Sequence, residues 1–550
     1  MNTKKFWFTC ASVTLAAMCC LHNADARNKF ANARPYYQPI TIYSNSGPSQ
    51  GIWLVKAQTP TDPIIQLTNQ PLDGISSSNI ATFDIWNYDT VKQEALKVSP
   101  RLLVYGLGGV LYSENLKTPG VPKQFSNGTY TQLCTLTALD GASYQKASSY
   151  LQAIVIPSGS GDCTTGVGTQ SWLIPASANK NTTPVVEPNG WNVLTAFSTL
   201  ADGSFQGWVV DNGSSIELDD ANFNFQSNLL TGLTSEDKVS LLGNHGSTVF
   251  ISVSHNDGTT ITNTVYRMTT SGADSIGSYS YAVGALCTSN GGIGGTVIDA
   301  SNDFFAFAEA TDTGYSVYRA SLVSGSAVAL YTDASGNECG SLAGEQVSAG
   351  HVVVNEYSPV TGFNRVIGVA EAGAANQVPA IMASGDANNF PSATYIIDGH
   401  AWIDDFNYPD SGPVTFTVLV RNGDGTSVAN YAGSRRIDDI WGGFRLGDNP
   451  NIDRQVVYLF TPNSTSCSGG TVVAIDPATF GQTSISGLPS DACSIYAYGW
   501  DPTSFGNVSE PAGNSIISID PNAGQLYILS IPQSLGTYAS TAYLPGYPFY

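Results

Sequence analysis

The sequence predicts an all-β protein, a β-propeller of about seven to eight four-stranded blades. Short alternating runs separated by Gly, Pro, Asn and Asp follow one another along the chain. Helical periodicity is nearly absent. A strand–turn–strand unit also occurs twice, 44 residues apart, which suits one blade of roughly 40–50 residues. Tandem β-sandwich domains are the alternative architecture.

The repeated unit lies near the end of the chain. Residues 471–489 read TVVAIDPATFGQTSISGLP, and residues 515–532 read SIISIDPNAGQLYILSIP. In each copy a β-branched run leads to Asp-Pro, and a second run begins at Gly-Gln. We therefore expect hairpins at equivalent places in successive blades, with Ile475 and Ile519 in matching positions. Residues 490–514, between the copies, then supply the inner strands of the last blade.

The pattern of a strand, Ile-Asp-Pro and a glycine resembles bacterial YVTN-type and quinoprotein-like propellers. The resemblance covers only residues 471–489 and 515–532, and it implies the fold alone. Nothing in the sequence matches a quinone-binding pocket. No functional residue is therefore transferred from these families, and no cofactor is predicted.

Tight turns and strands are predicted throughout the rest of the chain. Asp211-Asn212-Gly213, Asn256-Asp257-Gly258, Asp312-Thr313-Gly314 and Asn422-Gly423-Asp424-Gly425 lie between alternating runs. Their Asn, Asp and Gly residues supply the positive φ that tight hairpins need. Residues 303–331 accordingly predict three short consecutive strands.

The first 26 residues predict a secretory signal peptide. Two lysines precede an apolar run at residues 6–21, and Ala24-Asp25-Ala26 fits a cleavage site. The run is too short for a membrane span, and no later stretch is long and apolar enough to form one. We therefore expect a secreted protein, either extracellular or periplasmic.

Beyond the signal peptide, residues 27–39 are expected to form an extended arm and residues 40–550 a single propeller domain. Loss of the signal peptide would leave a net charge of −22, against −21 for the full chain. Such an acidic surface repels nucleic acid. The expected partner is instead a protein or a glycan.

Six cysteines follow the signal peptide and predict a disulfide framework in an exported protein. The simplest pairing joins sequence neighbours. It links Cys134 to Cys163, Cys287 to Cys339, and Cys467 to Cys493. No Cys-x-x-Cys spacing occurs, and no histidine lies close to these cysteines, so no metal site is predicted.

The sequence contains no convincing catalytic motif. Residues 47–51, Gly-Pro-Ser-Gln-Gly, have the letters of a nucleophile elbow, but residues 52–55 predict a strand where that motif needs a helix. Adjacent carboxylates such as Asp404 and Asp405 point to opposite faces of a strand, so they cannot form a glycosidase dyad by themselves. A non-catalytic protein is therefore expected.

Two stretches offer candidate ligand-binding residues. In residues 399–406, His400, Trp402 and Asp404 would share one face of a strand, where they could grip a sugar by stacking and hydrogen bonding. The alternative is a structural role between blades. The second candidate set is Arg435, Asp438 and Trp441.

These observations predict a secreted, non-catalytic binding or scaffold propeller whose ligand is a glycan or a protein. A carbohydrate-active enzyme, either a glycoside hydrolase or a lyase, is one alternative. A surface adhesion protein is the other.

Overall fold

The computed structural model describes most of the central part of the chain and isolated strands towards its two ends. The described residues are 37–42, 51–56, 65–66, 73, 80–83, 86–89, 94–98, 102–115, 122–140, 149–187, 191–199, 205–287, 293–299, 302–333, 335–343, 347–386, 388–397, 399–407, 415–432, 436–441, 456–462, 470–475, 479–485, 496–499, 504–507, 515–520 and 525–530. Within these ranges the regular secondary structure consists of β-strands, and none of it is α-helical. The predicted all-β class is confirmed.

The strands fall into consecutive antiparallel sheets. The first part of the chain contains β1 (Tyr37–Ile42), β2 (Gly51–Lys56), β3 (Ile65–Gln66), β4 (Ile80–Phe83), β5 (Trp86–Asp89), β6 (Glu94–Val98), β7 (Leu102–Leu107), β8 (Val110–Asn115), β9 (Lys123–Thr129), β10 (Gln132–Asp140), β11 (Ser149–Ile156), β12 (Gln170–Pro175), β13 (Val185–Val186), β14 (Asn192–Ser198), β15 (Phe205–Asp211), β16 (Ser215–Asp219) and β17 (Phe225–Thr231).

The middle of the chain contains β18 (Asp237–His245), β19 (Thr248–Asn256), β20 (Thr260–Thr269), β21 (Gly272–Ala282), β22 (Ile293–Asp299), β23 (Phe304–Ala310), β24 (Tyr315–Ala320), β25 (Val328–Thr332), β26 (Cys339–Leu342), β27 (His351–Tyr357), β28 (Asn364–Ala370), β29 (Ala380–Ser384), β30 (Asn389–Ile397), β31 (His400–Asn407), β32 (Thr415–Arg421) and β33 (Ser427–Tyr431). The last part contains β34 (Arg436–Trp441), β35 (Val456–Pro462), β36 (Gly470–Ile475), β37 (Gln482–Ile485), β38 (Tyr496–Gly499), β39 (Ser504–Asn507), β40 (Ser515–Asp520) and β41 (Gln525–Ser530).

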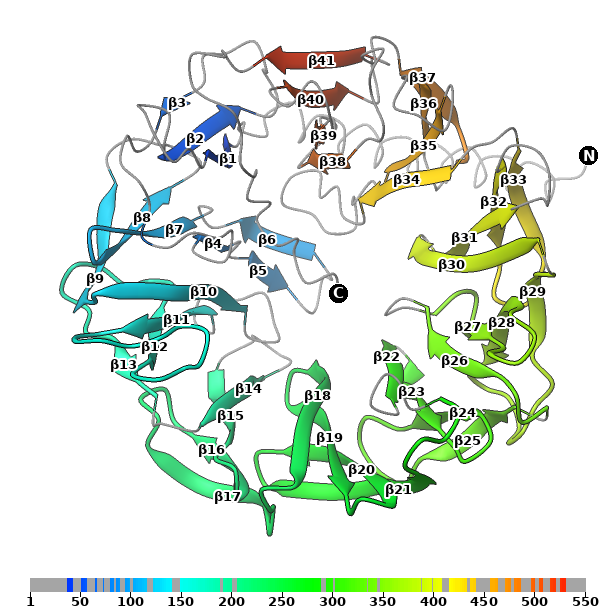
Figure 1. Ribbon diagram of the computed structural model, residues 1–550, viewed down its shortest axis with the longest axis horizontal. Helices are drawn as coiled ribbons and strands as arrows, with labels where there is room; N and C mark the ends of the chain where they lie inside the picture. Colours follow the sequence, from blue (N-terminus) through cyan, green and yellow to red (C-terminus); the bar gives the residue numbers. More distant parts are fainter. Residues whose placement is uncertain are drawn as a thin grey trace, which may run out of the picture.

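The sheets follow one another around a ring in chain order (Figure 1). In most sheets the first strand lies nearest the centre of the ring and the fourth lies at the outside. First strands contact one another from sheet to sheet, as in the pairs β14 with β18, β18 with β22, and β22 with β26. This radial arrangement is a β-propeller, as the sequence predicted, and not a pair of separate sandwiches.

Apolar layers between successive sheets form the core. Within β23, Phe305 packs against Phe250 of the preceding sheet, with ring centroids 3.9 Å apart. Its neighbour Ala306 packs with Val352 of the following sheet. Because successive side chains of a strand point to opposite faces, each sheet contributes to two layers.

A β-bulge recurs where the innermost strand pairs with the second strand. Register shifts occur between Leu133 and Thr135, Val193 and Thr195, Leu241 and Gly243, Ile293 and Thr296, Ala393 and Tyr395, and Ile437 and Asp439. A bulge increases the local twist of a strand. The recurrence of a bulge in the first strand of six sheets indicates that they are diverged copies of one unit.

The repeated hairpins predicted near the end of the chain are confirmed. They are β36–β37 and β40–β41, the third and fourth strands of successive sheets. Ile475 pairs with Gln482, and Ile519 pairs with Leu526. The first two strands of the last sheet, β38 and β39, lie between the copies as expected.

The predicted turns also join neighbouring strands. Asp312-Thr313-Gly314 connects β23 to β24, and β25 completes the predicted three-stranded run. Gly213, Gly258 and Gly425 adopt φ of 82°, 89° and 85° in their turns. Glycine is favoured there because a Cβ atom disfavours the left-handed region.

The predicted blade count is not confirmed. The described residues form nine four-stranded sheets, one three-stranded sheet (β1–β3) and one two-stranded sheet (β5–β6), more than the predicted seven to eight. The predicted number of blades was too low because it assumed longer loops between blades than the structure has. In the structure, β25 ends at Thr332 and the next sheet begins at Cys339. Strand β1 begins at Tyr37, within the segment predicted as an arm.

Candidate functional site

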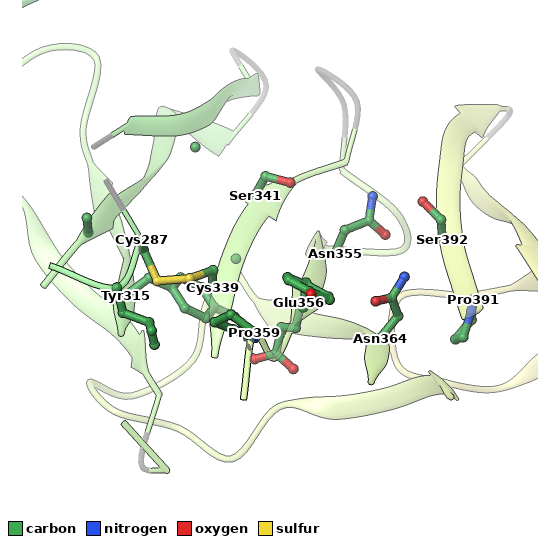
Figure 2. Close-up of a pocket in the computed structure, with 15 residues that line it drawn as sticks. Cys287, Tyr315, Cys339, Ser341, Asn355, Glu356, Pro359, Asn364, Pro391 and Ser392 are labelled. Atoms are coloured by element: carbon green, nitrogen blue, oxygen red, sulfur yellow. Dashed lines mark hydrogen bonds between the residues drawn. A yellow bond between two sulfur atoms is a disulfide. The ribbon is translucent and has the colours of Figure 1, made fainter. Parts of the chain in front are cut away.

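A pocket of about 300 Å³ opens where three successive sheets meet (Figure 2). Strands β23 and β27 end at the pocket, and β24, β26 and β28 begin there. The segment before β22 and the first part of β30 complete its walls. Because strand ends and connecting segments meet at one edge of the ring, residues far apart in the sequence line a single space.

The Cys287–Cys339 disulfide forms part of the pocket wall. It joins the segment before β22 to the first strand of the next sheet, with Cα atoms 5.3 Å apart. A second disulfide, Cys134–Cys163, joins β10 to the connection between β11 and β12. Both pairs were predicted and are confirmed. The third predicted pair, Cys467–Cys493, lies outside the described residues.

In the wall of the pocket, the buried carboxylate of Glu356 accepts hydrogen bonds from three side chains. The hydroxyls of Tyr315 and Tyr331 donate to its Oε1 at 2.6 and 3.0 Å, and Arg365 donates to its Oε2 through Nε. Burial, reinforced by the charge of Glu356, raises the pKa of both tyrosines. The phenols therefore stay protonated, and Glu356 supports the wall as a satisfied acceptor.

Two close contacts, one at Gly340 and one at the amide of Asn355, fix the shape of the pocket. The ring of Tyr315 would lie 2.1 Å from a Cβ added at Gly340, so a side chain at residue 340 would displace it. The amide of Asn355 bridges to β30: its Nδ2 donates to the carbonyl of Ala393 at 2.9 Å, and its Oδ1 accepts from the Ala393 N–H at 2.7 Å. These contacts hold neighbouring sheets at a defined separation.

Two buried acceptor oxygens at the pocket side of β28 and β31 have no donor. Within the described part of the chain, no hydrogen-bond donor reaches Asn364 Oδ1 or Asp405 Oδ1. Asn364 lines the pocket directly, and Asp405 lies opposite the lining residue Pro391 on the adjacent strand. A buried acceptor left unpaired costs roughly 1–3 kcal/mol. A donor from a ligand would remove that cost.

The side chain of Asp405 faces the β26–β29 sheet, which lines the pocket, and not the β34–β37 sheet on the other side. Ala401 and Ile403, at two-residue spacing on the same strand, pack with Val353 and Val366 of the β26–β29 sheet. Residues two apart share a strand face, so Asp405 continues this face towards the strand end. Burial, and then the charge of Asp386, raises the pKa of Asp405.

A carboxyl pair lies at the opposite edge of the same sheets, where β22 and β28 end. Asn302 Nδ2 donates to Asp299 Oδ2 at 2.7 Å and to Glu371 Oε2 at 3.3 Å. Arg319 donates to the backbone carbonyl of Glu371 at 2.7 Å. Burial, with the charge and hydrogen bond of Asp299, raises the pKa of Glu371 to about 7. A carboxyl group with this pKa can exchange a proton near neutral pH.

The first predicted ligand set lies in the layer between the β30–β33 and β34–β37 sheets. His400, Trp402 and Asp404 all belong to β31. Trp402 is fully buried and stacks on Tyr431, with ring centroids 6.0 Å apart. Asp404 is buried, and His400 Nδ1 lies 2.8 Å from Asn422 Oδ1. Ligand binding by this set stays a prediction, and a ligand would have to open this layer to reach Trp402.

The second predicted set is described only in part. Arg435 lies outside the described residues. Asp438 and Trp441 belong to β34, and Asp438 occupies the bulge between Ile437 and Asp439. Strand β34 contacts β32 of the preceding sheet.

Sequence reasoning paired Cys287 with Cys339 but did not predict the pocket that they help to line. Asn364 and Glu356 sit at strand ends next to the β27–β28 turn, with no motif to mark them. One signal in the sequence was Asp405. It follows Asp404 directly, so the two side chains point to opposite faces of the strand, and Asp405 lies on the face towards the pocket. The Cys287–Cys339 pair was the other, because a disulfide between sheets brings two segments to one place.

No protein-family model matches the chain, and no curated protein matches it. The crystal structure of the eukaryotic initiation factor is 10% identical to this chain, with a TM-score of 0.42, and the match covers 82% of this chain and 96% of that one. A prolyl endopeptidase structure is 10% identical, with a TM-score of 0.34, covering 70% and 55%.

Two further solved structures are similar. Puromycin hydrolase is 9% identical with a TM-score of 0.30, covering 69% of this chain and 52% of that one. Oligogalacturonate lyase from Vibrio parahaemolyticus is 11% identical with a TM-score of 0.29, covering 52% and 75%. The chain thus spans about half the length of the peptidase and puromycin hydrolase chains.

These findings correct the predicted function. The expectation of a non-catalytic binding or scaffold protein has no support in them and is not retained: the similar structures include peptidases and a lyase, at TM-scores of 0.29 to 0.34. The carbohydrate-active alternative gains no support either. At 9–11% identity the likeness shows the fold alone, so the function must be argued from this chain's own residues.

Proposed function

We propose that the pocket beside the Cys287–Cys339 disulfide is the substrate or ligand site of this protein and takes a molecule that donates hydrogen bonds. The observation that supports this most is the unpaired, buried Asn364 Oδ1 in its wall. A space of about 300 Å³ lies at the lower end of the range for small-ligand pockets.

The test is a thermal-shift screen of small amines, amides and alcohols against the full chain. Hits are then measured by calorimetry with Asn364→Ala, and with Asn228→Ala on the exposed outer strand β17 as the matched control. We expect Asn364→Ala to weaken the hits about fivefold or more, since it removes one hydrogen bond to the ligand. Equal affinities for both variants would overturn the proposal.

Acid–base catalysis is a second candidate function, favoured by the carboxyl pair Asp299–Glu371. A general acid or base works best with a pKa near the operating pH, and that of Glu371 is about 7. The pair lies at the far edge of the sheets from the pocket, so it would form a separate site. A hydrolysis screen with the wild type and Glu371→Gln tests it, because turnover that is unchanged by the substitution would exclude the pair.

We also propose that the chain is exported. Two disulfides and the apolar run at residues 6–21 support an oxidising compartment. Among the described residues, no helix is long and apolar enough to cross a membrane. N-terminal sequencing of the mature protein should begin at Arg27. A mature protein that retains residues 1–26 would contradict this expectation.

A further inference from the structure

We infer that the ligand of the pocket is a basic segment of polypeptide, which places a lysine or arginine side chain in the pocket and rests its neighbours on an apolar rim. This inference rests on the proposed pocket function and names the class of its ligand. Three independent features of the same edge support it: charge, unpaired acceptors and exposed apolar surface.

The edge around the pocket is acidic. Asp312 lies in the β23–β24 turn, Glu338 just before β26, and Asp386 between β29 and β30. Asp405 adds a carboxylate beside Pro391. Among the described residues of sheets β22–β33, the one basic side chain at this edge is Arg365, which is paired with Glu356.

The basic residues of these sheets otherwise lie at the opposite edge. Arg319 and Arg421 stand at the far ends of β24 and β32, and His351 and His400 at the far starts of β27 and β31. The sequence contains no lysine after Lys238. Charge complementarity therefore favours a cationic ligand at the pocket edge.

The unpaired acceptors fit the same ligand. A lysine ammonium or an arginine guanidinium offers several N–H donors and no acceptor. Asn364 Oδ1 and Asp405 Oδ1 are buried acceptors without a donor among the described residues. Tyr357 lines the pocket with 48% of its surface exposed, so its ring is open to a cation.

An apolar rim extends beyond the mouth of the pocket. Leu286 and Tyr357 line the pocket, and Val360 and Phe363 continue along the β27–β28 turn. Val360 and Phe363 are 67% and 40% exposed. A free amine would leave this rim uncovered. A polypeptide covers it with the apolar side chains on either side of its basic residue, and this is why we infer a polypeptide.

The test uses a fluorescein-labelled five-residue peptide with a central lysine between valine and phenylalanine. Fluorescence polarisation compares it with the same peptide carrying acetyl-lysine, and competition uses butylamine. We expect acetylation to weaken binding to the wild type by about tenfold or more, because it removes the charge. Raising the salt from about 50 to about 300 mM should weaken the unmodified peptide and leave the acetylated one nearly unchanged.

Two substitutions test whether the peptide binds at the edge of the ring that contains the pocket. Asp405→Asn and Phe363→Ser should each weaken the peptide about fivefold, whereas Phe363→Ser should leave butylamine unaffected. Thermal melting confirms that each variant folds, and the acetylation and salt measurements need no variant.

The outcomes separate the two proposals. One outcome is that the acetylated peptide binds as tightly as the unmodified one while Asn364→Ala weakens both. In that case the pocket is still the ligand site, but the inference of a cationic ligand is wrong. If butylamine competes with an affinity equal to that of the peptide, the inference of a polypeptide ligand is wrong. If the peptide binds equally well to Asn364→Ala and Asp405→Asn, the pocket itself is wrong. Absence of any peptide binding overturns the inference.

Discussion

Two regions of the ring differ in how they treat polar and aromatic side chains. In the layer between the β30–β33 and β34–β37 sheets, His400 and Trp402 come from one short stretch, and Trp402 is fully buried. At the pocket, Tyr315, Glu356 and Asn364 come from separate strand ends and surround an open space. A stretch of sequence rich in aromatic and polar residues thus forms part of the buried layer between sheets. The open pocket is instead formed by residues from several separate strand ends.

A second buried tryptophan, in another sheet, offers a comparison for Trp402. Trp208 lies in β15 and Trp402 in β31, each the second strand of its sheet. They face opposite layers: Trp208 packs towards the preceding sheet with Tyr150 and Leu173, whereas Trp402 packs towards the following sheet with Leu459 and Ile475. Both are buried with an indole N–H that has no partner among the described residues. Both side chains therefore serve packing between sheets.

The largest predicted effect separates stability from binding. Trp402→Ala should destabilise the protein by about 3–5 kcal/mol, because it leaves a cavity in the layer. Trp208→Ala, the matched control, should cost a similar amount. Neither substitution should change the affinity of the pocket for its peptide. Urea unfolding and fluorescence polarisation measure the two quantities, and a loss of affinity in Trp402→Ala alone would place the ligand in this layer.

Loss of the pocket disulfide should affect both stability and binding. The double substitution Cys287→Ser and Cys339→Ser opens a loop whose ends are 52 residues apart. The chain-entropy model gives a loss of roughly 3–4 kcal/mol. The control is the Cys134→Ser and Cys163→Ser pair, with a separation of 29 residues. It should cost nearly as much without weakening the peptide, and equal weakening in both would contradict a local role.

The carboxyl pair predicts a fall in stability with rising pH. The pKa of Glu371 is raised from 4.5 to about 7 on folding. The folded state therefore binds the proton more tightly, and its advantage is lost as pH rises through 7. Glu371 should contribute a loss of about 2 kcal/mol or less between pH 5.5 and 8.5. Glu371→Gln should flatten the profile measured by urea unfolding, and an unchanged slope would contradict the assignment.

The smallest expected effect concerns the unpaired acceptor. Asn364→Leu removes a buried oxygen without a donor, so the free energy of unfolding should stay the same or rise by about 1 kcal/mol. The control Asn355→Leu breaks two hydrogen bonds to Ala393 and should instead destabilise the protein. Thermal melting distinguishes the two, and a clear destabilisation by Asn364→Leu would show that its oxygen has a partner.

The sequence was sufficient for features whose cause is local. Asp-Pro turns after β-branched runs placed the hairpins that contain Ile475 and Ile519, and two of three cysteine pairings are confirmed. The number of sheets was underestimated because the spacing of blades depends on how short the connecting segments are. The pocket could not be predicted, since its residues meet only when successive sheets close side by side.

The central claim is that the ligand binds at the pocket edge and not in the layer around Trp402. Hydrogen–deuterium exchange of the full chain, with and without the lysine peptide, tests it most directly. We predict slower exchange in residues 355–364 and 389–393, with no change in residues 427–431. Protection confined to residues 427–431 and 479–485, the segments that pack around Trp402, would contradict the claim.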